Sequence, residues 1–234
     1  MCDDACMDVS KVNDAEALRR CATLRQWLYW PLLLLLAGCG TTEFEARPAI
    51  PTPLVEKIPV VVGIYMAPEF RDKVYREERE GADVAITLGR AQSEGFMRLM
   101  DAMFLRAVPV TSTDAGARTD PEIRGVLEPV LEDVAFVTPT DSGADVYAVS
   151  LKYRVNGYKP DGQFTDSWTF TGYGAAKVGN MLGIGTEALQ QATQLAMRDA
   201  GARLATELRE QAIVRGLLPA DSGAPATEEA DGPR

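Results

Sequence analysis

The residues able to do covalent or metal chemistry are few, and they lie near one end of the chain. The four cysteines are Cys2, Cys6, Cys21 and Cys39, and the sequence contains no histidine. No disulfide or thiolate metal site can therefore form after Cys39. Without histidine the chain lacks the commonest general base, the usual zinc ligand and the middle member of Ser-His-Asp or Cys-His catalysis. We therefore expect no catalytic residue, no cofactor and no metal site.

Cys39 follows a segment that has the order of an export signal. Residues 27–37 form an apolar run of eleven, which follows three arginines and is closed by the small residues Ala37 and Gly38. A membrane-spanning helix needs about 20 apolar residues, so this run is too short to serve as a stable anchor. We therefore interpret residues 1–38 as a secretory signal peptide that is removed.

The tetrapeptide Leu36-Ala37-Gly38-Cys39 resembles the lipobox of bacterial lipoproteins. The resemblance implies that the Cys39 thiol is diacylglycerylated, that the chain is cut before it, and that the new amino terminus is acylated. Several acyl chains give stable anchoring where one is marginal. The residue after the cysteine is Gly40 and not Asp, which resembles the pattern of lipoproteins sorted to the outer membrane. The implied location is the outer membrane, with the mature chain facing the periplasm.

The first 20 residues are unlike a normal signal peptide, because five acidic residues precede the arginines. We interpret this stretch as a start site assigned too early, with translation beginning nearer the arginines. Over the whole chain, 34 acidic residues outnumber 24 basic ones, which gives no electrostatic footprint for phosphate backbones. Nucleic acid is therefore not an expected partner.

The boundaries of the mature domain are predicted from composition. Residues 39–57 contain three prolines and favour an extended, solvated tether. The domain is expected over residues 58–216 and should begin with an apolar, β-branched strand at 58–66. Residues 217–234 are rich in Asp, Ser, Gly, Ala, Pro and Glu, so a disordered tail is expected.

Two amphipathic helices are predicted from apolar periodicity. Residues 91–106 repeat apolar side chains at helical spacing, namely Phe96, Leu99, Met100, Met103 and Phe104. Residues 186–214, capped by Thr186, present one face made of Leu189, Ala192, Ala196, Ala200, Leu204 and Leu208. The alanines should let this helix lie close to a sheet, and Gly201 marks either close packing or a kink. Residues 69–81 are interpreted as a charged excursion or a short surface helix.

Strands are indicated in the middle of the chain. Residues 147–155 alternate apolar and polar side chains, Lys159-Pro160-Asp161-Gly162 fits a turn, and a return strand carries Phe164, Trp168 and Phe170. A strand is also expected at 126–137, where Pro129 favours an edge position or a bulge. A short strand is expected at 107–111.

A glycine-rich stretch at 172–185 contains neither GxGxxG after a strand nor a Walker lysine. We interpret it as a flexible loop, and loops of this kind can carry function. The candidate partner-binding residues are those of this loop: Gly172, Tyr173, Gly174, Lys177, Gly179 and Gly183.

The order of these elements predicts an α+β fold, a two-layer sandwich in which two helices cover one face of a mainly antiparallel sheet. Its layout resembles that of small envelope-assembly lipoproteins, although no diagnostic motif of theirs is present after Cys39. The expected function is a noncatalytic binding or scaffold module, attached to the membrane through acyl chains on Cys39 and working with an envelope protein partner.

Two alternatives remain open. A lipoprotein that binds a lipid or small apolar ligand would hold it between helices and sheet. A filled core around Phe96, Met100, Met103 and Trp168 would argue against that. A glycan hydrolase using carboxylates alone would need two of its candidates in one cleft at glycosidase distance. Those candidates are Glu128, Glu132, Asp133 and Asp166.

Overall fold

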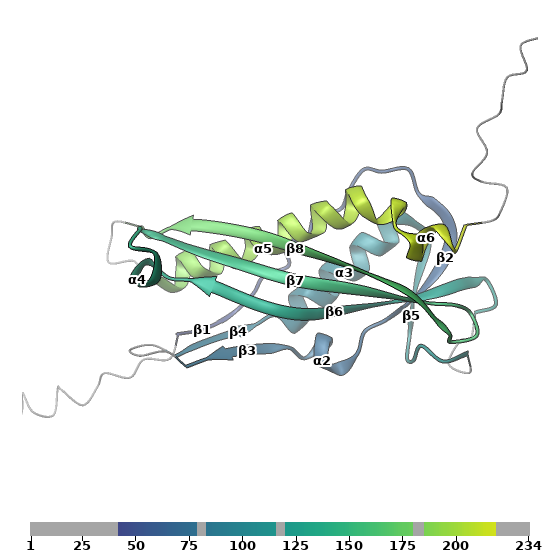
Figure 1. Ribbon diagram of the computed structural model, residues 1–234, viewed down its shortest axis with the longest axis horizontal. Coiled ribbons are helices and arrows are strands. Elements are labelled where there is room, and N and C mark those ends of the chain that lie inside the picture. The colour runs from purple at the N-terminus through teal and green to yellow at the C-terminus, as the bar shows by residue number, and fades with distance from the viewer. Residues whose placement is uncertain (1–41, 79–82, 116–119, 180–184, 219–234) are drawn as a thin grey trace, which may run out of the picture.

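The computed structural model describes residues 42–78, 83–115, 120–179 and 185–218. The expected signal peptide, Cys39 and Gly183 lie outside the described residues. The α+β class is confirmed, and its strands form two sheets, one of five strands and one of three (Figure 1).

The larger sheet is mixed, with the order β5-β2-β6-β7-β8. Its strands are β2 (Ile58–Tyr65), β5 (Phe104–Val110), β6 (Ile123–Val137), β7 (Val146–Tyr158) and β8 (Phe164–Lys177). β2 pairs in parallel with both β5 and β6, whereas β6, β7 and β8 pair antiparallel. The antiparallel strands are the longest, and β2 and β5 run parallel because the chain between them crosses back through α3.

The smaller sheet has the order β1-β4-β3 and is made of β1 (Thr42–Glu45), β4 (Val84–Thr87) and β3 (Val74–Glu77). β1 pairs in parallel with β4, and Phe44 and Ala46 are buried. The structure therefore differs from the expectation of a solvated tether over residues 39–57. A strand of four residues beside a proline-rich segment is too short to leave a periodic signal.

The rest of the expected tether lies across the two long helices, α3 (Gly89–Met103) and α5 (Gly185–Glu207). A Cβ atom built on Gly95 of α3 or on Gly201 of α5 would come within 2.8 Å of Ile50 side-chain atoms. Of the two roles expected for Gly201, the structure thus shows close packing. Lys57 Nζ donates to the Asp101 carbonyl oxygen at 2.8 Å. The folded unit therefore begins well before Ile58.

The remaining helices are short: α2 (Pro68–Arg71), α4 (Pro139–Ser142), the 3-10 turn η2 (Leu208–Glu210) and α6 (Ala212–Arg215). The 69–81 segment thus contains the end of α2 and then β3. The long C-terminal helix begins one residue before Thr186 and ends at Glu207, short of the expected Val214. Leu217 packs against the core beyond α6, so the ordered chain passes the expected end at residue 216.

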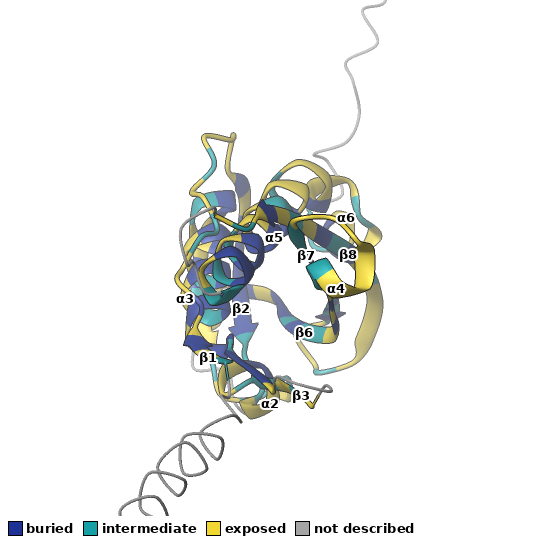
Figure 2. Cartoon of the chain, turned by 90° about the vertical axis from the view of Figure 1, so that its left-hand side faces the viewer, coloured by how far each residue is buried: buried dark blue, intermediate teal, exposed yellow. Residues whose placement is uncertain are grey.

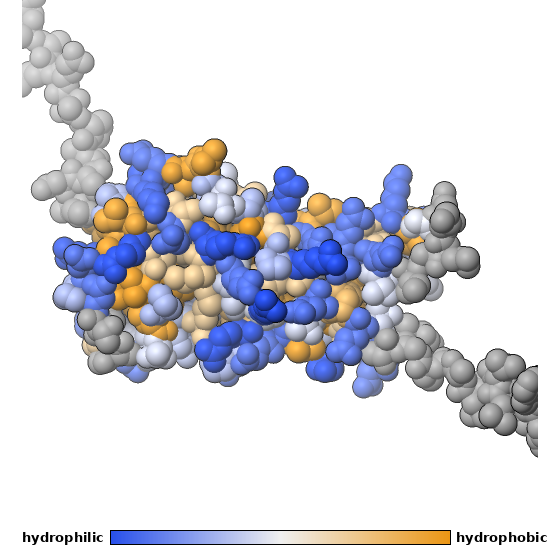
Figure 3. All heavy atoms as spheres, turned by 180° about the vertical axis from the view of Figure 1, so that it is seen from behind, coloured by the Kyte–Doolittle hydropathy of each residue, from blue (hydrophilic) through white to orange (hydrophobic). Residues whose placement is uncertain are grey.

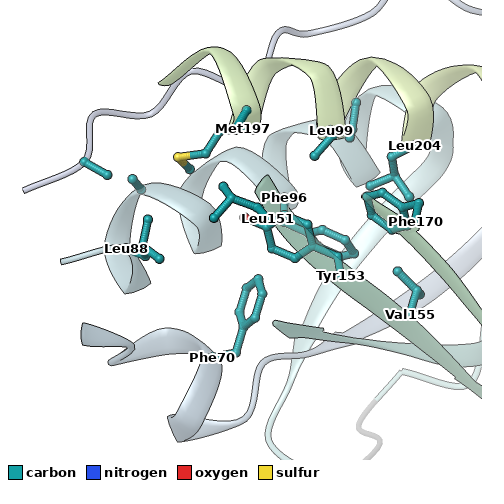
Figure 4. Close-up of a cluster of buried hydrophobic side chains, with 14 of the residues drawn as sticks. Phe70, Leu88, Phe96, Leu99, Leu151, Tyr153, Val155, Phe170, Met197 and Leu204 are labelled. Atoms are coloured by element: carbon teal, nitrogen blue, oxygen red, sulfur yellow. The ribbon is translucent and has the colours of Figure 1, made fainter. Parts of the chain in front are cut away.

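The core lies between the two long helices and the larger sheet (Figures 2 and 4). Phe96, Leu99, Met100, Met103 and Phe104 are all buried, as is the whole predicted face of α5. Tyr153 stacks on Phe170 at 5.7 Å between ring centroids and meets Phe70 edge-on at 6.4 Å. A hollow bordered by these aromatic rings measures about 10 Å³. Around these rings the space between helices and sheet is therefore filled with side chains, whereas a pocket of about 280 Å³ lies between α5 and the sheet at the α4 end.

The glycine-rich stretch is largely strand. Gly172 and Gly174 belong to β8, and a Cβ on either would lie 2.2 or 2.1 Å from a backbone oxygen of α5. Only glycine permits this approach, because any other side chain would overlap the helix backbone. The expected flexible loop is therefore wrong for residues 172–177, where the glycines serve helix-to-sheet packing. Gly179 follows the strand.

The predicted hairpin is confirmed and is longer than expected, with β7 and β8 paired from Val146–Lys177 to Tyr158–Phe164. Gly162 takes a φ of 89° in the turn, and its N–H donates to the Lys159 carbonyl at 3.0 Å. Pro129 lies in an interior strand, but at a position paired with β7 alone, because the β2 pairing ends at Leu127. The missing N–H of the proline therefore breaks no ladder to β2.

Candidate functional site

Exposed apolar side chains gather on the outer face of the larger sheet, away from the helices. We name this group the β6–β8 patch; its members are Ala135, Val137, Ala148, Tyr173 and Ala175. Strand register places them together, since Val137 pairs with Ala148, and Ala148 pairs with Ala175. Val137 is 43% exposed and Tyr173 is 60% exposed. These side chains border a shallow hollow of about 400 Å³.

Of the predicted partner-binding residues, only Tyr173 and Gly174 line this hollow. Gly172 lies beneath α5, Lys177 ends β8, and Gly179 follows the strand. Within the predicted site, Gly172 and Gly174 therefore serve packing against α5, and Tyr173 is the exposed aromatic residue.

The rest of the patch was missed in the sequence, although a signal exists. Residues 134–137 are apolar at four successive positions, so both faces of β6 are apolar there. Only one face, that of Val134 and Phe136, is covered by the core. A continuous apolar run on a strand with one covered face indicates an exposed patch.

The β6–β8 patch lies at the end of the molecule where β1 begins and α4 caps the sheet (Figure 1). β6 and β8 end there and β7 begins there. Thr42 at the start of β1 and Thr138 before α4 line the same pocket of about 280 Å³. Cys39 precedes Thr42 by three residues, which span at most about 11 Å. The patch therefore lies at the end of the domain nearest to Cys39 in the chain.

A network of charged side chains borders the patch along the same face. Glu132, the extra residue at a β-bulge, accepts ion pairs from Lys152 at 3.1 Å and Arg154 at 3.0 Å. Further along, Glu128 accepts hydrogen bonds from Asn156 Nδ2 at 3.0 Å and from the Tyr158 hydroxyl at 2.7 Å. Burial of the Tyr158 hydroxyl, and to a smaller extent its hydrogen bond to Glu128, raises the pKa of Tyr158 to about 12. The outer face therefore changes from apolar near α4 to paired charges in its middle.

These contacts bear on the expected hydrolase carboxylates. Glu128 and Glu132 each bind side chains of β7, and Asp166 accepts the Ser167 N–H at 2.8 Å. Asp133 follows the bulge on exposed strand surface. None of these four carboxylates lines the hollow at the β6–β8 patch or the pocket of about 280 Å³ beside α4.

The free edge of β8 is partly covered next to the patch. β8 is the outermost strand of its sheet, and the N–H of Tyr173 donates to Asp199 Oδ2 of α5 at 3.0 Å. Asp199 also pairs with Arg203 at 3.5 Å. An edge strand whose donors are occupied by a helix side chain is a poor template for another strand. A protein that binds here is therefore expected to use the face of the sheet and not its edge.

The described residues include no group of three Cys, Asp or Glu side chains placed to hold a metal ion. Among the same residues, no helix combines the length and apolar character needed to cross a bilayer. The surface seen from behind is mainly hydrophilic, with apolar atoms gathered toward the end that carries α6 (Figure 3).

No model of a protein family matches the sequence, and no curated protein matches it. Solved structures with a similar arrangement include a Xanthomonas campestris protein of the family DUF330, with a TM-score of 0.42, 12% identity, 71% of this chain and 92% of that one covered. A minor lipoprotein from Acinetobacter baumannii gives a TM-score of 0.39 at 10% identity, over 66% and 94% of the two chains. A putative neuraminyllactose-binding hemagglutinin homolog from Helicobacter pylori gives 0.42 at 11% identity, over 74% and 97%. At these TM-scores the likeness carries no functional argument.

Proposed function

We propose that this chain is a lipid-anchored, noncatalytic binding module of the bacterial cell envelope, attached through Cys39 to the outer membrane and facing the periplasm. The β6–β8 patch is the observation that carries the proposal, because it is an exposed apolar surface on the face of the sheet that the helices leave uncovered. Contiguous exposed apolar patches mark interaction sites more often than apolar side chains scattered singly over a surface do. The partner is an envelope protein that covers this face.

The lipobox residues Leu36 to Cys39 support the anchored location, and Gly40 supports sorting to the outer membrane. The noncatalytic character is supported by the lack of histidine and by the engagement of Glu128 and Glu132 in hydrogen bonds and ion pairs. The filled core around Phe96 and Tyr153 argues against a ligand held at that place between the helices and the sheet.

Site-specific photocrosslinking in intact cells tests the proposal. A photoreactive amino acid replaces Val137 or Tyr173 in the patch, and Phe164 serves as the matched control. Phe164 is also an exposed aromatic residue of β8, at 53%, but it lies at the opposite end of the strand. We expect both patch positions to capture the same envelope protein and the control position not to capture it.

A second variant shows whether the capture depends on the patch. Ala148→Glu places a charge at the centre of the patch. Ala148 lines the outer hollow, so the new side chain points away from the core. We expect this substitution to abolish capture from Tyr173 while the far-ultraviolet circular dichroism stays that of the wild type. Equal capture from Phe164, or capture that survives Ala148→Glu, would show that the patch does not bind the partner. Cys39→Ser should release the chain from the membrane fraction, and retention there would refute the anchor.

A further inference from the structure

A second surface, unrelated to the β6–β8 patch, combines apolar side chains with unpaired positive charge. It is a groove of about 530 Å³ at the carboxyl ends of the parallel strands β2 and β5. Its apolar lining comes from Ile64, Met66, Met97, Pro109 and Val110. We name it the β2–β5 groove. Its volume falls within the range of about 300–1,000 Å³ that is usual for small-molecule sites.

The groove lies where two parallel strands end side by side. The chain leaves β2 and returns through α3 to β5 on one side, and then passes to β6 on the other side of β2. The reversal of strand order falls between β2 and β6, so the groove, which is lined from β2 and β5, does not lie at a topological switch point. Ile64 and Val110 lie at the carboxyl ends of β2 and β5.

Two arginines flank the apolar lining, Arg71 at the end of α2 and Arg98 on α3. Within the part of the chain that the structure describes, neither forms an ion pair or a hydrogen bond through its side chain. The one carboxylate at the groove, Glu94, is paired with Arg90 at 2.9 Å. In a chain of net charge −10, the groove therefore carries a local excess of positive charge.

The groove also holds an unpaired polar atom. The Ser93 hydroxyl oxygen is buried and has no hydrogen-bond partner in the structure. A serine in a helix commonly satisfies its hydroxyl with the carbonyl four residues earlier, as Thr193 does with Leu189 at 2.8 Å. Ser93 makes no such bond, so an unpaired buried polar atom lies beside the apolar lining of the groove.

From these observations we infer that the β2–β5 groove binds an anionic amphiphile, with its acidic head on Arg71 and Arg98 and its apolar part on the methionines. Guanidinium groups bind carboxylate and phosphate oxygens in a two-pronged geometry, which fixes the head group. Met66 and Met97 adapt to an irregular apolar chain, because their side chains are unbranched and flexible. A ligand with an acidic head and an apolar chain thus matches both the arginines and the apolar lining of the groove.

The test uses the purified full chain in the presence of nanodiscs of zwitterionic lipid, with a photoactivatable fatty acid as the probe, so that it does not require acylation of Cys39. After irradiation, labelled peptides are mapped by mass spectrometry. We expect labelling on peptides that contain Met66 or Met97. Excess oleate or lysophosphatidic acid should compete, which separates carboxylate from phosphate heads. Neither monoolein, which has an uncharged head, nor inorganic phosphate, which has no chain, should compete.

Variants separate the charges from the apolar lining. Replacing Arg71 and Arg98 by Gln should weaken labelling about tenfold for each arginine, a change that corresponds to about 1.4 kcal/mol. Arg124→Gln is the matched control, because Arg124 is an exposed arginine that does not line the groove, and it should label as the wild type does. Circular dichroism verifies that each variant is folded.

Three results would overturn the inference. They are labelling confined to other peptides, competition by monoolein equal to that by oleate, and labelling unchanged in the double arginine variant. None of these results depends on the β6–β8 patch, so the two proposals fail separately.

Discussion

The close approach of α5 to β8 makes the two glycines of β8 the sharpest test of the fold. In Gly172→Ala, the new Cβ would lie 2.2 Å from the Ala196 carbonyl oxygen, and in Gly174→Ala it would lie 2.1 Å from that of Ala192. The atoms in the way are helix backbone, so α5 must move as a body. Overpacking of this kind costs about 1–3 kcal/mol. Loss of glycine entropy in the unfolded chain offsets about 0.4–1 kcal/mol of that cost.

The net expectation is a loss of about 1–2 kcal/mol for each single variant, which lowers the melting temperature by roughly 2–8 °C in a domain of this size. The double variant should lose less than the sum, because one shift of α5 relieves both contacts. Gly179→Ala is the control, since nothing lies within 4 Å of its Cβ position. Urea denaturation followed by circular dichroism measures all four proteins. Single variants as stable as Gly179→Ala would refute the close approach.

Three further predictions concern the core, the pH dependence and the anchor. Ile50→Ala should lower the free energy of unfolding by roughly 2 kcal/mol in urea denaturation, because Ile50 packs on both long helices, whereas Leu54→Ala, at a fully exposed position, should not. Burial raises the pKa of Tyr153, so its contribution to stability is present below pH about 10 and is lost as the pH rises further. Melting temperatures from pH 8 to 11 should therefore fall less steeply in Tyr153→Phe than in the wild type, and equal slopes would contradict this assignment. Inserting a flexible segment of Gly and Ser after Gly40 should leave the melting temperature unchanged but weaken crosslinking from the β6–β8 patch.

The elements that could be predicted are those with a strong period. The stripe of α3, the alanine face of α5 and the alternation of β7 each follow from spacing alone, and the side chains concerned are buried as expected. These elements are long enough for one face to be recognised. They establish the α+β class, since two helices and a hairpin leave few ways to cover the apolar faces.

The elements that could not be predicted depend on contacts far apart in sequence. β1 has four residues and is held by β4, some forty residues later, so its local composition resembles that of a linker. The glycines of β8 resemble a loop because their role depends on α5 lying over them. The β2–β5 groove could not be predicted for the same reason, because Arg71 and Arg98 come from separate helices that only the fold brings to one groove.

The position of β1 changes what an acylated Cys39 would mean for work at the membrane. A free tether of 18 residues would have an average reach of about 23 Å and would leave the domain free to turn. Instead the Thr42 N–H donates to the Asp83 carbonyl at 2.8 Å, and at most about 11 Å of chain separates Thr42 from Cys39. An anchored chain would therefore hold the α4 end of the domain at the bilayer surface. The β6–β8 patch lies at this end, so the proposed partner of an anchored chain would approach it at the membrane. Anchoring of both proteins in one membrane would then raise their effective concentration, and a patch of modest affinity would suffice.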